Sequence, residues 1–259
     1  MESKPHDMLF AFNHDADVEL MCVGRSGIKL SVINNVLHDP HGLAALGLAQ
    51  TYAEDRGNLY PGVRATVPEA FSASFRAWLT PILQQTKLLE SNQVIASDTS
   101  FFSVVTTAAK DLLPIQCIPH YDSTDPNLYA AVIYLCSPRF SGTAFYRHRR
   151  TGYEEITQHN VSNYQLALNS DMRIHGAPQK EYINGDNLLF ERIFSNPLKF
   201  NGAIIYPARI LHAAEIEKQF NSPQDPSEWR LTVTALLRSV RVQSHESGEA
   251  GNIRIAPLS

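Results

Sequence analysis

The sequence predicts a mostly β protein with flanking helices, whose short strands close into a barrel or stack as a double-sheet jelly roll. Helical segments lie in the first third of the chain, before about residue 93. From there on, segments rich in β-branched and aromatic residues alternate with turn residues. Because short strands must close or stack to hide their edges, this order favours a barrel or a jelly roll.

The N-terminal third combines strands with helices. Residues 21–37, "MCVGRSGIKLSVINNVL", are typical of two short strands around the turn "GRSG". Residues 39–57 predict a helix that starts at an Asp-Pro pair and stops at the glycine that ends the segment. Residues 67–90 predict a second helix, with Pro68 in its first turn and a break at Pro81.

The body of the chain has the composition of successive strands. The segments in question are SFFSVVTTA, LLPIQCIPHYD, LYAAVIYLCS, SGTAFYRH, NLLFERIFS, NGAIIYPARILHAAE and EWRLTVTALLRSV. The sequence therefore predicts one domain over residues 1–259, with strands and flanking helices in 1–92 and the strand-rich core in 93–241. We expect an insertion at about 150–195 and a loose polar tail over 242–259.

Composition and charge restrict the partners of the protein. The chain is 44% hydrophobic and 19% charged, and its net charge of −4 argues against a general nucleic-acid binder. It has no apolar run of roughly 18–20 residues, so we expect no membrane span. The first twenty residues lack the apolar core of a secretory signal, which predicts a cytoplasmic protein. The three cysteines form no CxxC pair and predict reduced thiols; the oligomeric state, including a homodimer, stays open.

One short motif indicates a metal site. In "IPHYDSTDP", His120 and Asp122 stand two positions apart after a strand-like run, so a strand would aim both at the same face. A third ligand is supplied by His212 at the end of "YPARILH", with His175 as its rival. Two histidines and one carboxylate with open positions are typical of non-heme Fe(II) oxygenases. A polar strand end without a metal is the alternative.

A second motif follows the distal histidine. Arg230 opens the alternating strand "WRLTVTALL", and Thr232 lies two residues later on the same face. A buried guanidinium beside a hydroxyl suits a carboxylate, because its planar fork matches the two carboxylate oxygens. A structural ion pair is the alternative role for Arg230.

Together these motifs resemble the Fe(II)/2-oxoglutarate-dependent dioxygenases. The run "HYDSTDPNLYAAVIYLCSPRFSGTAFY" is most similar to the prolyl-hydroxylase-like branch, and the whole chain resembles an uncharacterised bacterial family within that superfamily. Tyr134 falls where that branch places a tyrosine that contacts 2-oxoglutarate. The match spans about residues 95–240, and "SGTAF" departs from the family's GGxxxF turn because Ser141 replaces the first glycine.

The resemblance implies a fold, a set of cofactors and an activity. The fold is a double-stranded β-helix (jelly-roll) core, and the cofactors are Fe(II), 2-oxoglutarate as co-substrate, and O₂. His120, Asp122 and His212 would hold iron, and Arg230, helped by Thr232 and Tyr134, would hold 2-oxoglutarate.

The implied reaction is the hydroxylation of an unactivated C–H bond in an amino-acid-like, peptidyl or other small substrate, with release of succinate and CO₂. Related halogenases lack the carboxylate at the position of Asp122, so its presence favours hydroxylation, with desaturation and cyclisation left open. The alternatives are a non-catalytic jelly-roll protein and a cupin-type metal-binding protein that does not use 2-oxoglutarate.

The interval between His120 and His212 is longer than compact members of the superfamily lead us to expect, and the excess falls in the insertion. We expect the insertion to border the substrate pocket and to order when substrate binds, with packing outside the sheet as the alternative. The basic turn beside it contributes Arg147, Arg149 and Arg150 as candidates for binding an anionic substrate group; a solvated turn is the alternative.

Overall fold

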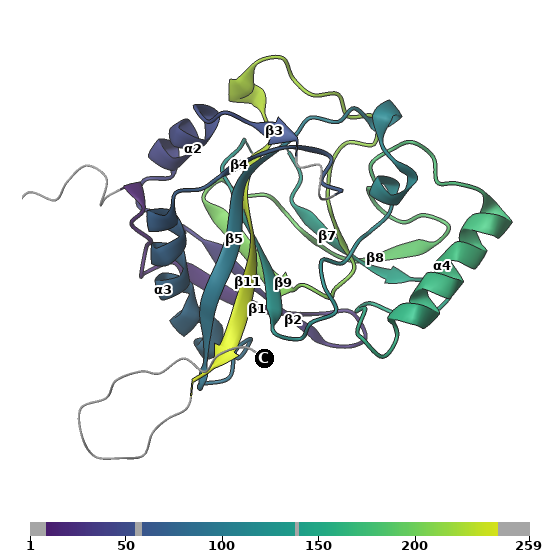
Figure 1. The fold of residues 1–259 in the computed structure, drawn as a ribbon, viewed down its shortest axis with the longest axis horizontal. Coiled ribbons are helices and arrows are strands. Elements are labelled where there is room, and N and C mark those ends of the chain that lie inside the picture. Colours follow the sequence, from purple (N-terminus) through teal and green to yellow (C-terminus); the bar gives the residue numbers. More distant parts are fainter. Residues whose placement is uncertain (1–8, 55–58, 138–139, 243–259) are drawn as a thin grey trace, which may run out of the picture.

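The computed structural model describes residues 9–54, 59–137 and 140–242, and its largest element is an eight-stranded antiparallel sheet (Figure 1). In spatial order its strands are β1 (Asp17–Val23), β2 (Ile28–Asn34), β9 (Gly202–Pro207), β6 (Leu128–Tyr134), β11 (Leu231–Arg241), β5 (Gln93–Val105), β4 (Gly62–Thr66) and β3 (Ala53–Glu54). Of the predicted loose tail, residues 243–259 lie outside the described residues.

A second, three-stranded antiparallel sheet faces the first. Its strands are β10 (His212–Ala214), β7 (Thr143–His148) and β8 (Phe190–Asn196). A single bridge between His120 and His212 adds the segment around His120 to its edge. From β5 onward the chain therefore passes repeatedly from one sheet to the other, which confirms the prediction of a mostly β protein.

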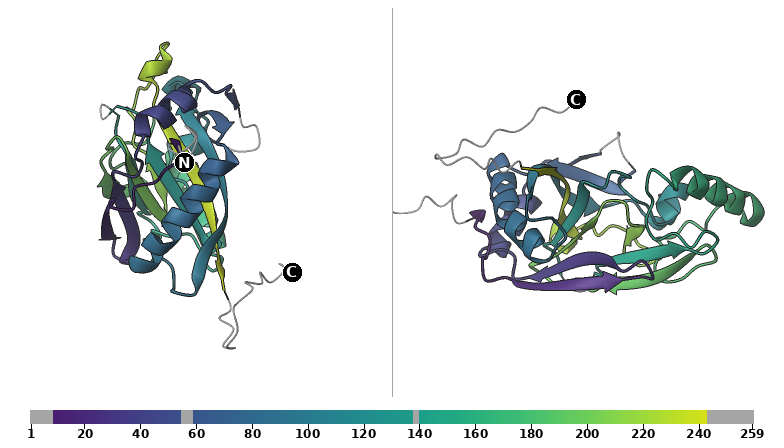
Figure 2. Two further views of the ribbon diagram at one scale, coloured as in Figure 1. Left: turned by 90° about the vertical axis from the view of Figure 1, so that its left-hand side faces the viewer. Right: turned by 90° about the horizontal axis from the view of Figure 1, so that it is seen from below.

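Among the described residues, three α-helices cover the outer faces of the two sheets. They are α2 (Pro40–Leu48), α3 (Glu69–Gln85) and α4 (Val161–His175). The first two gather on one side of the molecule and α4 lies on the opposite side, as the views of Figure 1 and Figure 2 show. Within the described residues, no helix is both long and apolar enough to cross a membrane.

Alternation along β11 sorts its side chains between two cores. Leu231 and Val233 belong to an apolar cluster that includes Phe71 and Phe75 of α3, outside the large sheet. Thr232 and the residues that alternate with the apolar ones therefore face the space between the sheets. At one end this space is filled by an apolar cluster that includes Tyr206. The inner face is consequently the place where polar side chains of both sheets meet.

The two N-terminal helices differ from the sequence prediction. The first was expected to run to Gly57 but ends at Leu48, and β3 follows; residues 55–58 lie outside the described residues. The second continues through Pro81, so the predicted break there is wrong. Proline cannot donate to the carbonyl four residues earlier, that of Ala77. Since both residues are exposed, water can satisfy that carbonyl.

The segment "LLPIQCIPHYD" is also different from its prediction. It was expected to be a strand, but it forms a short 3-10 helix at Pro114–Cys117 and only then reaches the bridge at His120. Pro114 and Pro119 have no backbone N–H, so neither can donate to a sheet ladder.

The predicted insertion contains α4 and most of β8. Because β8 pairs with β7 along its length, β8 is part of the small sheet and not of an inserted element. The helix packs on the outer face of that sheet, where Tyr164 contacts the rings of Tyr121 and His148. Packing outside the sheet, the alternative left open by the sequence, therefore describes α4; ordering on substrate binding stays a prediction.

Candidate metal centre and carboxylate site

His120 and His212 are brought together by backbone pairing. The N–H of His120 donates to the carbonyl of His212 at 2.9 Å, and the reverse bond measures 2.8 Å. The two imidazole rings lie 4.3 Å apart between centroids. Because directly opposed residues in a bridge share a face, both rings point into the space between the sheets.

Asp122 completes the cluster from a bend rather than from a strand. Its N–H donates to the carbonyl of Ala208 at 2.8 Å, which fixes the bend against the end of β9. One carboxylate oxygen lies 3.8 Å from Nε2 of His120 and the other lies 3.6 Å from Nε2 of His212. His120 and Asp122 thus lie close together as predicted. The continuous strand from which the sequence predicted this is absent at these residues.

The three side chains have the chemistry of a metal site. Their ligand atoms lie within 4.8 Å of one another, and no other such cluster occurs in the described part of the chain. Bonds from divalent transition metals to these atoms are roughly 2.0–2.2 Å long, so small side-chain rotations suffice to close the site. The Nδ1 atom of His212 lies 2.9 Å from the carbonyl of Ile210. A hydrogen bond to that carbonyl puts the proton on Nδ1 and leaves Nε2 free for a metal.

His120 is also available as a neutral ligand. Desolvation by surrounding protein atoms and the nearby His212 lower the pKa of His120 to about 4. Solvent still reaches 53% of its side chain and 32% of that of Asp122, but only 6% of that of His212. The ligands are therefore fixed at the back and open on one side, as a site with free coordination positions requires.

Arg230 lies on the same inner face, immediately before β11. It is 3% exposed, and its guanidinium donates to the carbonyl of Gly142 at 2.8 Å and, at longer distance, to that of Ser141. Among the described residues, no carboxylate pairs with this guanidinium. A buried cation that is hydrogen-bonded to carbonyl oxygens and not to a carboxylate is a favourable partner for an anion that enters the space between the sheets.

Two residues with hydroxyl groups lie on the same inner face as Arg230. The hydroxyl of Tyr134 lies 2.7 Å from Oγ1 of Thr143, and the ring of Tyr134 has the Arg230 guanidinium 6.0 Å from its centroid. Thr232 is fully buried and donates its hydroxyl to the carbonyl of Ser103 at 3.3 Å. Rotation of these hydroxyls can redirect their protons toward a carboxylate.

Tyr206 packs beside the metal cluster, and the sequence did not single it out. Its ring lies 4.8 Å from that of His212, and burial followed by the charge of Asp122 raises its pKa well above the usual value. The charge of Arg230 acts on it in the opposite direction. The alternation of β9 placed Tyr206 on an inner position, which was the available signal.

The three candidate arginines of the basic turn are engaged elsewhere. Arg147 is buried and pairs with Glu154, and its Nη1 donates to Glu191 at 2.8 Å. Arg149 pairs with Asp186 at 2.8 Å. Burial opposes ionisation of Glu154, but backbone N–H donors at residues 25 and 26 and the Arg147 pair outweigh it and lower its pKa. The structure therefore does not bring these arginines to the triad.

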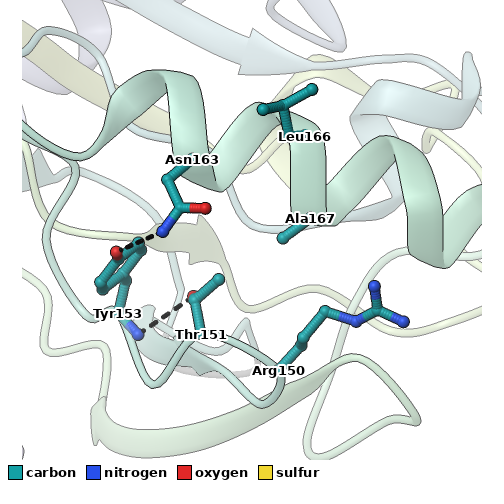
Figure 3. A pocket seen from close by; sticks show the side chains of 6 residues that line it. All are labelled: Arg150, Thr151, Tyr153, Asn163, Leu166 and Ala167. Carbon is teal, nitrogen blue, oxygen red and sulfur yellow. Dashed lines mark hydrogen bonds between the residues drawn. The ribbon is translucent and has the colours of Figure 1, made fainter.

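Arg150 lines a hollow of about 420 Å³ between the basic turn and α4 (Figure 3). None of the triad residues lines this hollow. The guanidinium of Arg150 pairs with Asp171 at 2.8 Å, and the other carboxylate oxygen of Asp171 lies 3.1 Å from the buried His148. His175, the rival third ligand, is exposed at the end of α4 and outside the cluster.

Several solved structures are similar to this chain. The non-heme α-ketoglutarate-dependent epimerase SnoN from nogalamycin biosynthesis is 13% identical, with 89% of this chain and 90% of that chain covered and a TM-score of 0.45. A Pseudomonas putida prolyl-4-hydroxylase is 11% identical, with 82% and 94% covered and a TM-score of 0.44. HygX from Streptomyces hygroscopicus is 11% identical, with 81% and 82% covered and a TM-score of 0.42.

Two of these proteins have been solved with ligands. SnoN was solved with Fe³⁺, α-ketoglutarate and nogalamycin RO, and HygX with iron or with nickel and 2-oxoglutarate. They are of the class that the sequence resemblance names. Because these TM-scores are below 0.5, the function proposed for this chain is derived from its own residues alone.

No curated protein matches the chain. A family described as "Family of unknown function (DUF6445)" matches residues 14–237, which is most of the sequence. The matched range includes the three candidate ligands and Arg230. It also includes the strands of both sheets, except for the last residues of β11. The chain belongs to the DUF6445 family.

Proposed function

We propose that this protein is an Fe(II)- and 2-oxoglutarate-dependent oxygenase on a double-stranded β-helix (jelly-roll) core. The passage of successive strands between the two sheets supports the core, since a jelly roll is formed by such alternation. The chain would then be a single oxygenase domain, with its core at 93–241 and its N-terminal strands and helices packed around the large sheet.

One observation carries the proposal. A two-histidine, one-carboxylate cluster and a buried arginine without a described carboxylate partner lie on the inner side of the two sheets. A metal site alone would need no cation at the position of Arg230. A dicarboxylate that binds the metal at one end requires a cationic group at its other end, and Arg230 is placed to supply it.

Each residue has a defined part in the proposed site. His120, Asp122 and His212 would hold Fe(II) on one side and leave the other side open. Arg230, with the hydroxyls of Tyr134 and Thr232, would bind the far carboxylate of 2-oxoglutarate. With iron, 2-oxoglutarate and O₂ bound, such a site supplies an oxidant for an unactivated C–H bond and releases succinate and CO₂.

The surrounding residues would shape the space between the sheets. Tyr206 packs against His212, and the apolar cluster to which it belongs would exclude water from that side of the metal cluster. Asp122 favours hydroxylation of an amino-acid-like, peptidyl or other small substrate, because it occupies the position that halide takes in related halogenases.

Turnover without a substrate tests the proposal. The protein is stripped of metal, reloaded with Fe(II) and supplied with 2-oxoglutarate in air, and succinate is measured. We expect slow succinate formation that requires Fe(II) and is abolished in His212→Ala and Asp122→Ala. Binding of the metal without binding or consumption of 2-oxoglutarate would overturn the proposal in favour of a cupin-type or non-catalytic protein.

A further inference from the structure

Among the described residues, the two sheets have four edge strands, and β1 is the longest one with a regular register. At the other edge of the large sheet, β3 is two residues long, and in the small sheet β10 has three residues. The pairing of β8 with β7 is interrupted by a shift in register, whereas β1 pairs with β2 over seven residues without a shift. Because short or bulged edges discourage pairing with another chain, β1 is the edge most open to it.

Solvent reaches β1 along its outer side. The first four residues of the strand are exposed, and so is Cys22. Val18 and Leu20 are 37% and 41% exposed although both are apolar. These three residues alternate along the strand and therefore lie on one face. The right-hand view of Figure 2 shows the purple hairpin of β1 and β2 along the lower border of the molecule. Within the described residues, no strand pairs with the outer edge of β1.

The hairpin of β1 and β2 is held at both ends. At its turn, the backbone N–H groups of Arg25 and Ser26 donate to the buried carboxylate of Glu154 at 2.9 and 3.0 Å. At the start of β1, the side-chain amide of Asn35 donates to the carboxylate of Asp17 at 3.1 Å. A strand that is already fixed loses little conformational entropy when it pairs, so β1 is preorganised to accept another strand.

The charges along the edge select the direction of such pairing. Asp15, Asp17 and Glu19 lie at the N-terminal end of β1, and Arg25 follows its C-terminal end. Two copies paired in parallel and in register would place carboxylate beside carboxylate, which is unfavourable. Antiparallel pairing instead brings the acidic end of each copy beside the arginine of the other. The edge is thus complementary to itself about a two-fold axis, as the interface of a symmetric dimer requires.

One register pairs all seven residues of β1 with β1 of a second copy. On the exposed apolar face, it places Leu20 opposite the partner's Leu20 and Val18 opposite the partner's Cys22. On the other face, Glu19 lies opposite the partner's Met21, so no two like charges are directly opposed. Moving the axis by one residue, to Glu19, would bring two carboxylates together.

We propose that β1 is the interface of a homodimer, in which the large sheets of two copies join by antiparallel pairing of β1 about Leu20. The pairing covers the exposed apolar face of β1 and supplies hydrogen-bond partners to the backbone groups of the edge. None of the paired residues belongs to the proposed metal or carboxylate site, so the dimer and the proposed function can be tested separately.

Sedimentation velocity of the full chain measures the association. We expect the mass to rise from that of one chain, 28.9 kDa, toward twice that value as the concentration increases from about 1 to 300 μM, since one strand pair is a small interface. Leu20→Lys should weaken association at least about tenfold, because two ammonium groups would face each other at the axis. Leu166→Lys changes an exposed leucine of α4 in the same way and should associate like the parent protein.

Complementary variants and a cross-link test the register itself. Leu20→Glu should also associate at least about tenfold more weakly than the parent protein. An equimolar mixture of Leu20→Lys and Leu20→Glu should recover the dimer, because an ammonium of one copy then faces a carboxylate of the other. Under mild oxidation, Val18→Cys should form a disulfide with the partner's Cys22, which non-reducing electrophoresis detects. The double variant Val18→Cys with Cys22→Ser should not, because its thiols are not opposed.

Four results would overturn the proposal. The first two are a parent protein that stays monomeric over this range and association that is unchanged in Leu20→Lys. The third is a mixture of the two Leu20 variants that associates no better than either variant alone. The fourth is a Val18→Cys protein that cross-links no better than the double variant with Cys22→Ser.

Discussion

Arg230→Met should sharply weaken the binding of 2-oxoglutarate and leave metal binding intact. In the structure Arg230 is 3% exposed, and the hydrogen bonds of its guanidinium to described residues go to the carbonyls of Ser141 and Gly142, so an incoming carboxylate would be desolvated against it. Removing one partner of a buried, hydrogen-bonded charge pair costs about 2–5 kcal/mol, which is about 30-fold or more in affinity. None of the three metal ligands contacts this guanidinium directly.

Calorimetric titration of the Zn(II)-loaded protein with 2-oxoglutarate measures the effect without turnover. Arg241→Met serves as the control, because it removes an exposed arginine at the far end of the same strand. Arg230→Lys should recover only part of the affinity, since an ammonium cannot form the two parallel hydrogen bonds. Equal affinity in the parent protein and Arg230→Lys would refute the fork argument, and equal affinity in Arg230→Met would remove Arg230 from the site.

Three further predictions concern single side chains. Tyr134→Phe removes a hydroxyl that lies 2.7 Å from Thr143, and calorimetry should show 2-oxoglutarate binding weakened by about fivefold, or about 1 kcal/mol, with Zn(II) binding unchanged. Glu154→Gln should lower the free energy of unfolding by about 3–5 kcal/mol at pH 7. Because the folded pKa of Glu154 is lowered, its stabilisation is present above the unfolded value of 4.5 and lost as pH falls through the folded value, so denaturant titrations of parent and variant should converge in acid. Pro81→Ala should raise the free energy of unfolding by about 1–3 kcal/mol, because it restores a helical hydrogen bond to Ala77 at an exposed position; an unchanged or lower value would contradict this account.

The candidate site was accessible from the sequence because its signals are local. The pair His120 and Asp122 and the spacing of Arg230 and Thr232 can each be found within one short segment, and His212 ends a strand-like run. The structure brings the first pair together with His212 even though the predicted strand is a single bridge, because hydrogen bonds to other segments supply the constraint that the strand would have given.

Other features depend on pairing between distant segments and could not be predicted. Thr232 lies beside Tyr134 and Ser103 only because β11 pairs with β6 and with β5, and no local pattern in the sequence specifies those registers. The local sequence around Pro81 predicts a helix break, but packing of α3 on the large sheet overrides that preference. Arg147 lies in a basic segment that looks solvated, and its burial follows from partners that include Glu191 on β8.

Anaerobic titration of the Fe(II)-loaded protein with 2-oxoglutarate tests the central claim most directly. Chelation of iron by the co-substrate gives a weak visible charge-transfer band, which reports the metal and 2-oxoglutarate in one measurement. We predict that the band appears in the parent protein, is absent in His212→Ala, and needs about 30-fold more 2-oxoglutarate in Arg230→Met. A protein that binds Fe(II) but shows no band at saturating 2-oxoglutarate, or an unchanged band in His212→Ala, would contradict the account.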